Sequence, residues 1–118
     1  MSELPTSELM PTARRVGDAI VISVRGEIDM HNSPQLRSEV LYLLNTGKPR
    51  KLIVDLAQVA YMDSSAVAVL VESLKTMHRT GGKVCLLNLQ PRVKGILEIS
   101  RLNAVFSICK DEQEALAK

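Results

Sequence analysis

A short polar run, Asp63-Ser64-Ser65, has the composition and position of a site that accepts a phosphoryl group. It follows an apolar segment typical of a buried strand and precedes a segment with the apolar spacing of a helix. The free N–H groups and partial positive charge of a first helical turn stabilise an added dianion. The same residue types are also typical of a plain N-cap, in which a side-chain oxygen accepts from those N–H groups. The local sequence leaves both interpretations open.

A second polar segment, residues 26–32, also joins an expected strand to an expected helix. If the two strands are parallel, both segments open at the same edge of the sheet, where open α/β sheets place their functional crevices. Asp29 is then expected near Ser64. His31 is a candidate for recognition, because loop residues often carry function.

The elements that position these segments alternate between strand and helix. Residues 12–16 and 19–24 are predicted to form a hairpin around the Gly17-Asp18 turn. Further strands are expected at residues 51–56, 84–87 and 105–109. Helices are expected from a Ser33 N-cap to Gly47, from the Asp63 region to Gly81-Gly82, from Pro91, and after Asp111, which has Glu114 three residues later. This order predicts an α/β fold with a mixed, mostly parallel sheet, an N-terminal hairpin and about four α-helices.

The length of 118 residues fits a single domain, expected at residues 11–118, and residues 1–10 are expected to form a flexible arm because they lack periodicity. The 15 basic and 13 acidic residues nearly balance, and the chain has no Trp, two Tyr and one Phe. This composition argues against direct nucleic-acid binding. We also expect no membrane contact, since no apolar stretch is long enough to span a bilayer. Without a secretory signal, and with Cys85 and Cys109 in apolar runs, the chain is expected to be cytoplasmic and reduced.

Signatures of catalysis are missing from the sequence. The stretch Thr80-Gly81-Gly82-Lys83 lies after a helix and before a strand, which reverses the order that a phosphate-binding loop needs. No GxGxxG, HExxH or GxSxG motif occurs. His31 and His78 are too few and too far apart in sequence to predict a metal cluster. We therefore expect no enzymatic activity, no cofactor and no metal.

The informative segments together resemble the STAS domain family and, within it, the anti-sigma factor antagonists of bacteria. The likeness covers residues 12–118. It is carried by Gly26-Glu27-Ile28-Asp29, by Leu52-Ile53-Val54-Asp55-Leu56, by Tyr61-Met62-Asp63-Ser64-Ser65, by the Gly81-Gly82 turn and by the helix that begins at Pro91. The chain departs from the family at Ala66, which replaces the glycine that usually follows the two serines.

The resemblance implies a phosphorylation-controlled switch that binds an anti-sigma factor and thereby releases a sigma factor. In the family the anti-sigma factor is also a serine kinase, and it phosphorylates the serine after the aspartate, here Ser64. The phosphorylated form lets go, and a PP2C-type serine phosphatase resets it. The partner-binding residues that the resemblance implies are Asp29, Met30, His31, Met62, Asp63, Ser65 and Ala66. The methyl group of Ala66 is expected to affect how closely the kinase approaches.

Two other hypotheses stay open. The same fold can serve as a non-phosphorylated STAS scaffold, or as an accessory subunit of a larger regulatory or transport complex. A small flavodoxin-like enzyme is the other alternative, although the sequence has no cofactor loop.

Overall fold

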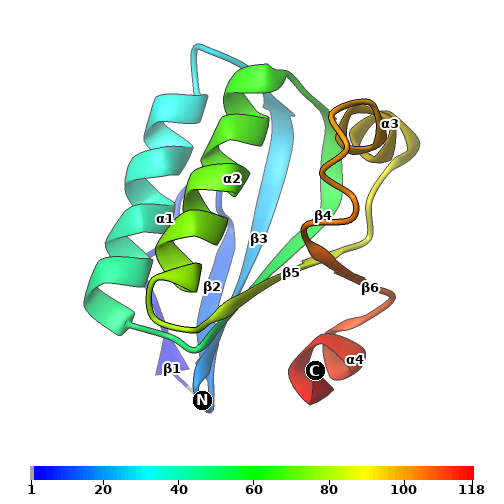
Figure 1. Cartoon of the computed structure of the whole chain (residues 1–118). Coiled ribbons are helices and arrows are strands. Elements are labelled where there is room, and N and C mark those ends of the chain that lie inside the picture. Colours follow the sequence, from blue (N-terminus) through cyan, green and yellow to red (C-terminus); the bar gives the residue numbers. More distant parts are fainter. Residues whose placement is uncertain (1) are drawn as a thin grey trace.

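Six strands form one mixed sheet, and they lie in the sheet in the order in which they occur along the chain (Figure 1). A computed structural model describes residues 2–118, Ser2 by its backbone alone. The elements are β1 (Ser2–Glu3), β2 (Thr12–Val16), β3 (Ala19–Ile28), α1 (Ser33–Gly47), β4 (Lys51–Met62), α2 (Ser64–His78), β5 (Lys83–Leu87), α3 (Pro91–Ile99), β6 (Ser107–Cys109) and α4 (Glu112–Ala117). Strands β1, β2 and β3 pair antiparallel, whereas β3 to β6 pair parallel. The predicted α/β fold and its N-terminal hairpin are confirmed.

Both faces of the central strands are covered by apolar groups. In Figure 1, α1 and α2 lie side by side over one face of the sheet. The main core lies beneath them and includes Ile22 and Val54. The opposite face has a smaller cluster around Val21 and Ile53, on which α4 packs through Ala115. Strands covered on both faces need apolar residues at successive positions, which explains the near-continuous apolar runs in β3, β4 and β5.

The two cysteines belong to the smaller cluster as free, buried thiols. Burial raises the pKa of the Cys85 thiol, and the neighbouring Cys109 raises it further. Cys85 therefore stays protonated at neutral pH and acts as a small apolar side chain.

Strand β4 continues past the predicted end at residue 56 to Met62. The exposed pair Ala57 and Gln58 interrupts its apolar run, and the register with β3 shifts there. The Asp55 carboxylate holds this irregular stretch, because it accepts the Ala57 N–H and the Asn88 side-chain amide, each at 3.0 Å. The extension carries β4 beyond its pairing with β5, which ends at Asp55, and brings Asp63 to the carboxyl edge of the sheet.

Residues 2–10, expected as a loose arm, make defined contacts with the domain. Strand β1 pairs with β2, the Arg25 N–H donates to the Leu9 carbonyl at 2.8 Å, and Met10 is buried in the main core. A two-residue strand and a turn have no periodicity, so the sequence did not reveal these contacts. Met1 lies outside the described residues.

The helix boundaries agree with the sequence except at α1. Asn32 and not Ser33 is the N-cap, and Ser33 is the buried first residue of the helix. Asp111 caps α4 as predicted, since its carboxylate accepts the Glu114 N–H at 2.8 Å. The last strand begins at Ser107 rather than at residue 105. Within residues 2–118, no helix combines the length and the apolar character needed to cross a membrane.

Candidate functional site

Helix α2 begins at a carboxylate cap. Asp63 Oδ1 accepts the Ser65 N–H at 2.9 Å and the Ala66 N–H at 3.3 Å, and the Ser65 hydroxyl donates to the same oxygen at 2.5 Å. The Ser65 hydroxyl has the largest effect in lowering the pKa of Asp63, and the N–H groups of Ala66, Ser65 and Met30 lower it further. Asp63 is therefore ionised at neutral pH, and the N-cap interpretation is confirmed for this residue.

The two serines that follow Asp63 differ in what they expose. Ser64 is the first residue of α2 and lies exposed at the surface. Ser65 is half-buried, and its hydroxyl is used by Asp63. Within the described chain, no hydrogen bond to another residue holds the Ser64 hydroxyl. Ser64 is thus the serine whose oxygen another protein can reach without first breaking a contact.

A second cluster of hydrogen bonds fixes the β3–α1 junction, residues 29–32. The Asn32 side chain accepts the Asp29 N–H at 2.9 Å and donates to the Glu27 carbonyl at 2.9 Å. The Asp29 carboxylate accepts the His31 N–H at 2.9 Å, and His31 Nδ1 lies 3.6 Å from it. The turn is therefore held by its own side chains, in the manner of an Asx turn.

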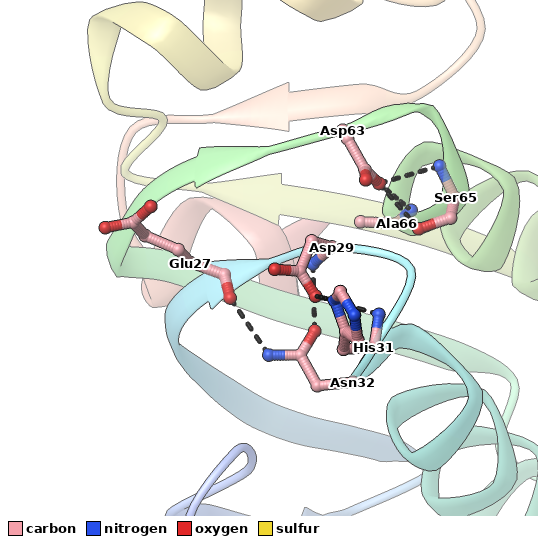
Figure 2. A network of polar contacts seen from close by, with 7 residues as sticks. All are labelled: Glu27, Asp29, His31, Asn32, Asp63, Ser65 and Ala66. Carbon is pink, nitrogen blue, oxygen red and sulfur yellow. Dashed lines mark hydrogen bonds and ion pairs between the residues drawn. The ribbon is translucent and has the colours of Figure 1, made fainter.

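The β3–α1 junction and the β4–α2 junction, residues 63–66, meet at one edge of the sheet (Figure 2). Ile28 and Met62 are register partners in parallel strands, and the Asp63 N–H donates to the Ile28 carbonyl at 3.0 Å. The Met30 N–H also stabilises the Asp63 carboxylate. The structure thus brings the two polar segments together, as parallel strands require.

The candidate residues divide into an exposed group and a buried pair. His31 and Met30 face solvent: the His31 side chain is 89% exposed and the Met30 residue 70%, and Asp29 is half-exposed. Met62 and Ala66, in contrast, are 3% and 1% exposed and belong to the main core. These two side chains pack in the core and not on the surface, so their predicted part in partner binding stays a prediction.

Comparisons with known proteins show the family of this chain. A family model described as the STAS domain matches residues 10–115. The chain belongs to the STAS domain family. The anti-sigma-B factor antagonist of Bacillus subtilis (strain 168) is 32% identical over 89 residues, which cover 75% of this chain and 80% of that protein.

Two solved structures share the fold of this STAS domain. The anti-sigma factor antagonist SpoIIAA in its unphosphorylated form superposes with a TM-score of 0.77 at 25% identity, covering 89% of this chain and 91% of that one. The Bacillus cell fate determinant SpoIIAA in the phosphorylated form has a TM-score of 0.70 at 24% identity, covering 90% and 96%. The second likeness shows the fold alone.

Two features of this STAS domain were not predicted from the sequence. Asn32 locks the β3–α1 junction, and its spacing of three residues from Asp29 is the signal that predicts such a turn. The Arg92 guanidinium lies 4.8 Å from the centre of the Tyr61 ring, which places a cation from α3 beside the last residues of β4. No local pattern predicts this second contact, since the two residues lie on different elements.

The site is a surface rather than an enclosed pocket. Of five cavities found in the described chain, four have no lining residue from either junction, and the fifth reaches the site only through Asn32. No group of three or more His, Cys, Asp or Glu side chains within residues 2–118 is arranged to hold a metal ion. The exposed and rigid arrangement fits a contact with another protein.

Proposed function

We propose that this STAS domain is an anti-sigma factor antagonist whose binding to its partner is controlled by phosphorylation of Ser64. The observation that carries the proposal is the exposed Ser64 hydroxyl at the first position of α2, directly after the ionised Asp63 cap. The names of the relatives support the class of partner, and SpoIIAA has been solved both with and without phosphate.

The structure supports Ser64 over Ser65 as the acceptor. A kinase needs a hydroxyl that it can reach and deprotonate, and the Ser65 hydroxyl is already engaged in a hydrogen bond to Asp63. Phosphorylation of Ser65 would break that bond and press a dianion against the carboxylate. A phosphoryl group on Ser64 extends into solvent from the N-terminus of α2, where the helix dipole favours negative charge. The fold therefore tolerates the modification at Ser64.

Release of the partner follows from charge. The phosphoryl group adds a charge of about −2 at pH 7. With Asp63 and Asp29 it would place three acidic groups on one contact surface. An interface that fits a neutral hydroxyl must then desolvate or repel these charges, and a penalty of about 3 kcal/mol lowers affinity roughly a hundredfold. In this proposal the partner is an anti-sigma factor with serine kinase activity, and a PP2C-type phosphatase restores the binding form.

A phosphorylation assay with matched serine variants tests the proposal. The full chain, Ser64→Ala and Ser65→Ala are each incubated with the cognate anti-sigma kinase and ATP, and the products are analysed by mass spectrometry. We expect one phosphoryl group on the wild type and on Ser65→Ala, and none on Ser64→Ala. Phosphate on Ser64→Ala would contradict the assignment. An unmodified wild type that still binds its partner would favour the scaffold alternative.

A further inference from the structure

Met30 is exposed in a way that the other described methionines are not. Its exposed fraction is 70%, whereas Met10, Met62 and Met77 are 2–3% exposed. A large apolar side chain in water adds nothing to the stability of the fold. A flexible thioether of this kind is, however, well suited to filling an irregular apolar pocket on another protein.

The backbone around Met30 is fixed, so its exposure is built into the site. On one side the Asp29 N–H donates to Asn32, and on the other the His31 N–H donates to Asp29. The Met30 N–H itself stabilises the Asp63 carboxylate. A partner that contacts Ser64 therefore meets the Met30 side chain on the adjoining junction, surrounded by polar neighbours. Apolar anchors with a polar rim contribute much of the affinity of protein interfaces.

We propose that Met30 is an oxidation-sensitive anchor of the partner-binding surface, a proposal that rests on the function proposed above. A hydroperoxide transfers one oxygen atom to the Met30 sulfur. With hydrogen peroxide the O–O bond breaks, an S=O bond forms, the thioether is oxidised to the sulfoxide and the peroxide is reduced to water. The sulfoxide is polar and resists burial in an apolar pocket, so oxidised protein binds its partner more weakly. The surface then responds to oxidation at Met30 as well as to phosphorylation at Ser64.

Peptide mapping after mild peroxide treatment tests the selectivity of the reaction. Trypsin places Met30 in the peptide of residues 26–37, Met62 in residues 52–75 and Met77 in residues 76–79. On the folded full chain, we expect the sulfoxide in the Met30 peptide first, because the sulfur atoms of Met62 and Met77 are covered. Oxidation of the three methionines at the same rate would overturn the proposal.

Binding measurements test the anchor itself. We expect peroxide to lower the affinity of the wild type for the anti-sigma factor by about tenfold. A methionine sulfoxide reductase should restore the affinity, and the affinity of Met30→Leu should be the same before and after peroxide. The bound partner should also shield Met30 from oxidation. Sulfoxide at Met30 with unchanged affinity would contradict the anchor, whereas failure of untreated protein to bind would count against the proposed function instead.

Discussion

The two strand-to-helix junctions at the carboxyl edge of the sheet are built differently. At the β4–α2 junction, the Asp63 side chain caps the helix, and the next residue, Ser64, is left in solvent. At the β3–α1 junction, the N-cap residue Asn32 makes no side-chain bond to the helix, and its amide fixes the loop instead. The polar side chain of the β4–α2 junction, Asp63, thus bonds to its helix, whereas that of the β3–α1 junction, Asn32, bonds within the turn.

Because of this difference, the two junctions present different groups at the same surface. The β4–α2 junction, which we call the capped junction, holds the Ser64 hydroxyl on the first turn of α2. The β3–α1 junction exposes Met30 and His31 to solvent. The bond from the Asp63 N–H to the Ile28 carbonyl fixes the two junctions relative to each other. If one partner contacts both junctions, as we propose, a charge placed on one junction acts on that partner without any change of fold.

The largest effect should come from negative charge at the capped junction. We expect Ser64→Asp to lower the affinity for the anti-sigma factor by about tenfold or more, because the new carboxylate lies beside the ionised Asp63. His31→Asp places the same charge on the turn and should cost less. Titration calorimetry of both variants provides the measurement. Equal losses would mean that the two junctions do not differ in the way described.

The next largest effect concerns the buried side of the capped junction. Ala66→Gly should lower the free energy of unfolding by about 1–2 kcal/mol, because it removes a buried methyl group and a good helix former. The exposed Ala68 on the same helix gives a matched control, since Ala68→Gly loses only the helix propensity. Denaturant unfolding compares the two. Phosphorylation of Ser64 should be unchanged in Ala66→Gly, and a faster reaction would show that the methyl group does obstruct the kinase.

The loss of folding stability at acid pH should depend on Asp63. The pKa of Asp63 is lowered in the folded protein, so its stabilising effect is present above the pKa of the unfolded chain and is lost as the pH falls through the folded value. Asp63→Asn keeps a capping side chain without the charge. Thermal unfolding of both proteins from neutral pH to about pH 3 should show a difference in Tm that shrinks as the pH falls. A difference that does not vary with pH would refute the role of the carboxylate.

The smallest effect should come from the ion pair between α1 and α2, the helices that follow the two junctions. The Arg37 guanidinium donates twice to the Glu72 carboxylate at 2.6 Å, which raises the pKa of Arg37 and lowers that of Glu72. The pair is exposed, and such pairs contribute little to stability. Arg37→Met should therefore change partner affinity by less than about twofold. A larger change would mean that the helices, and not the Asp63–Ile28 contact, set the spacing of the junctions.

Regular apolar patterns predicted most of the fold, because strands and helices with one periodic face leave a local signal. The extension of β4 left none, since its register depends on Asp55 and on Asn88 from a distant loop. The contacts of residues 2–10 left no local signal for the same reason: their partners, such as Arg25, lie elsewhere in the chain.

The candidate site was predicted in outline, but its exposed and buried members could not be separated. Adjacent residues of a strand point to opposite faces of the sheet. Because the apolar pattern of β4 is interrupted after residue 56, the sequence did not show which face Met62 is on. Ser64 and Ser65 are identical in type, and in the structure their exposure and the bond from Ser65 to Asp63 distinguish them. Residue type indicated the chemistry of this edge, and long-range contacts decided which atoms are accessible.

The most direct test of the switch is a paired titration of the same anti-sigma factor with unmodified protein and with protein phosphorylated at Ser64. The charge mechanism predicts a dissociation constant that is roughly a hundredfold higher for the phosphorylated form. Equal constants for the two forms would contradict it.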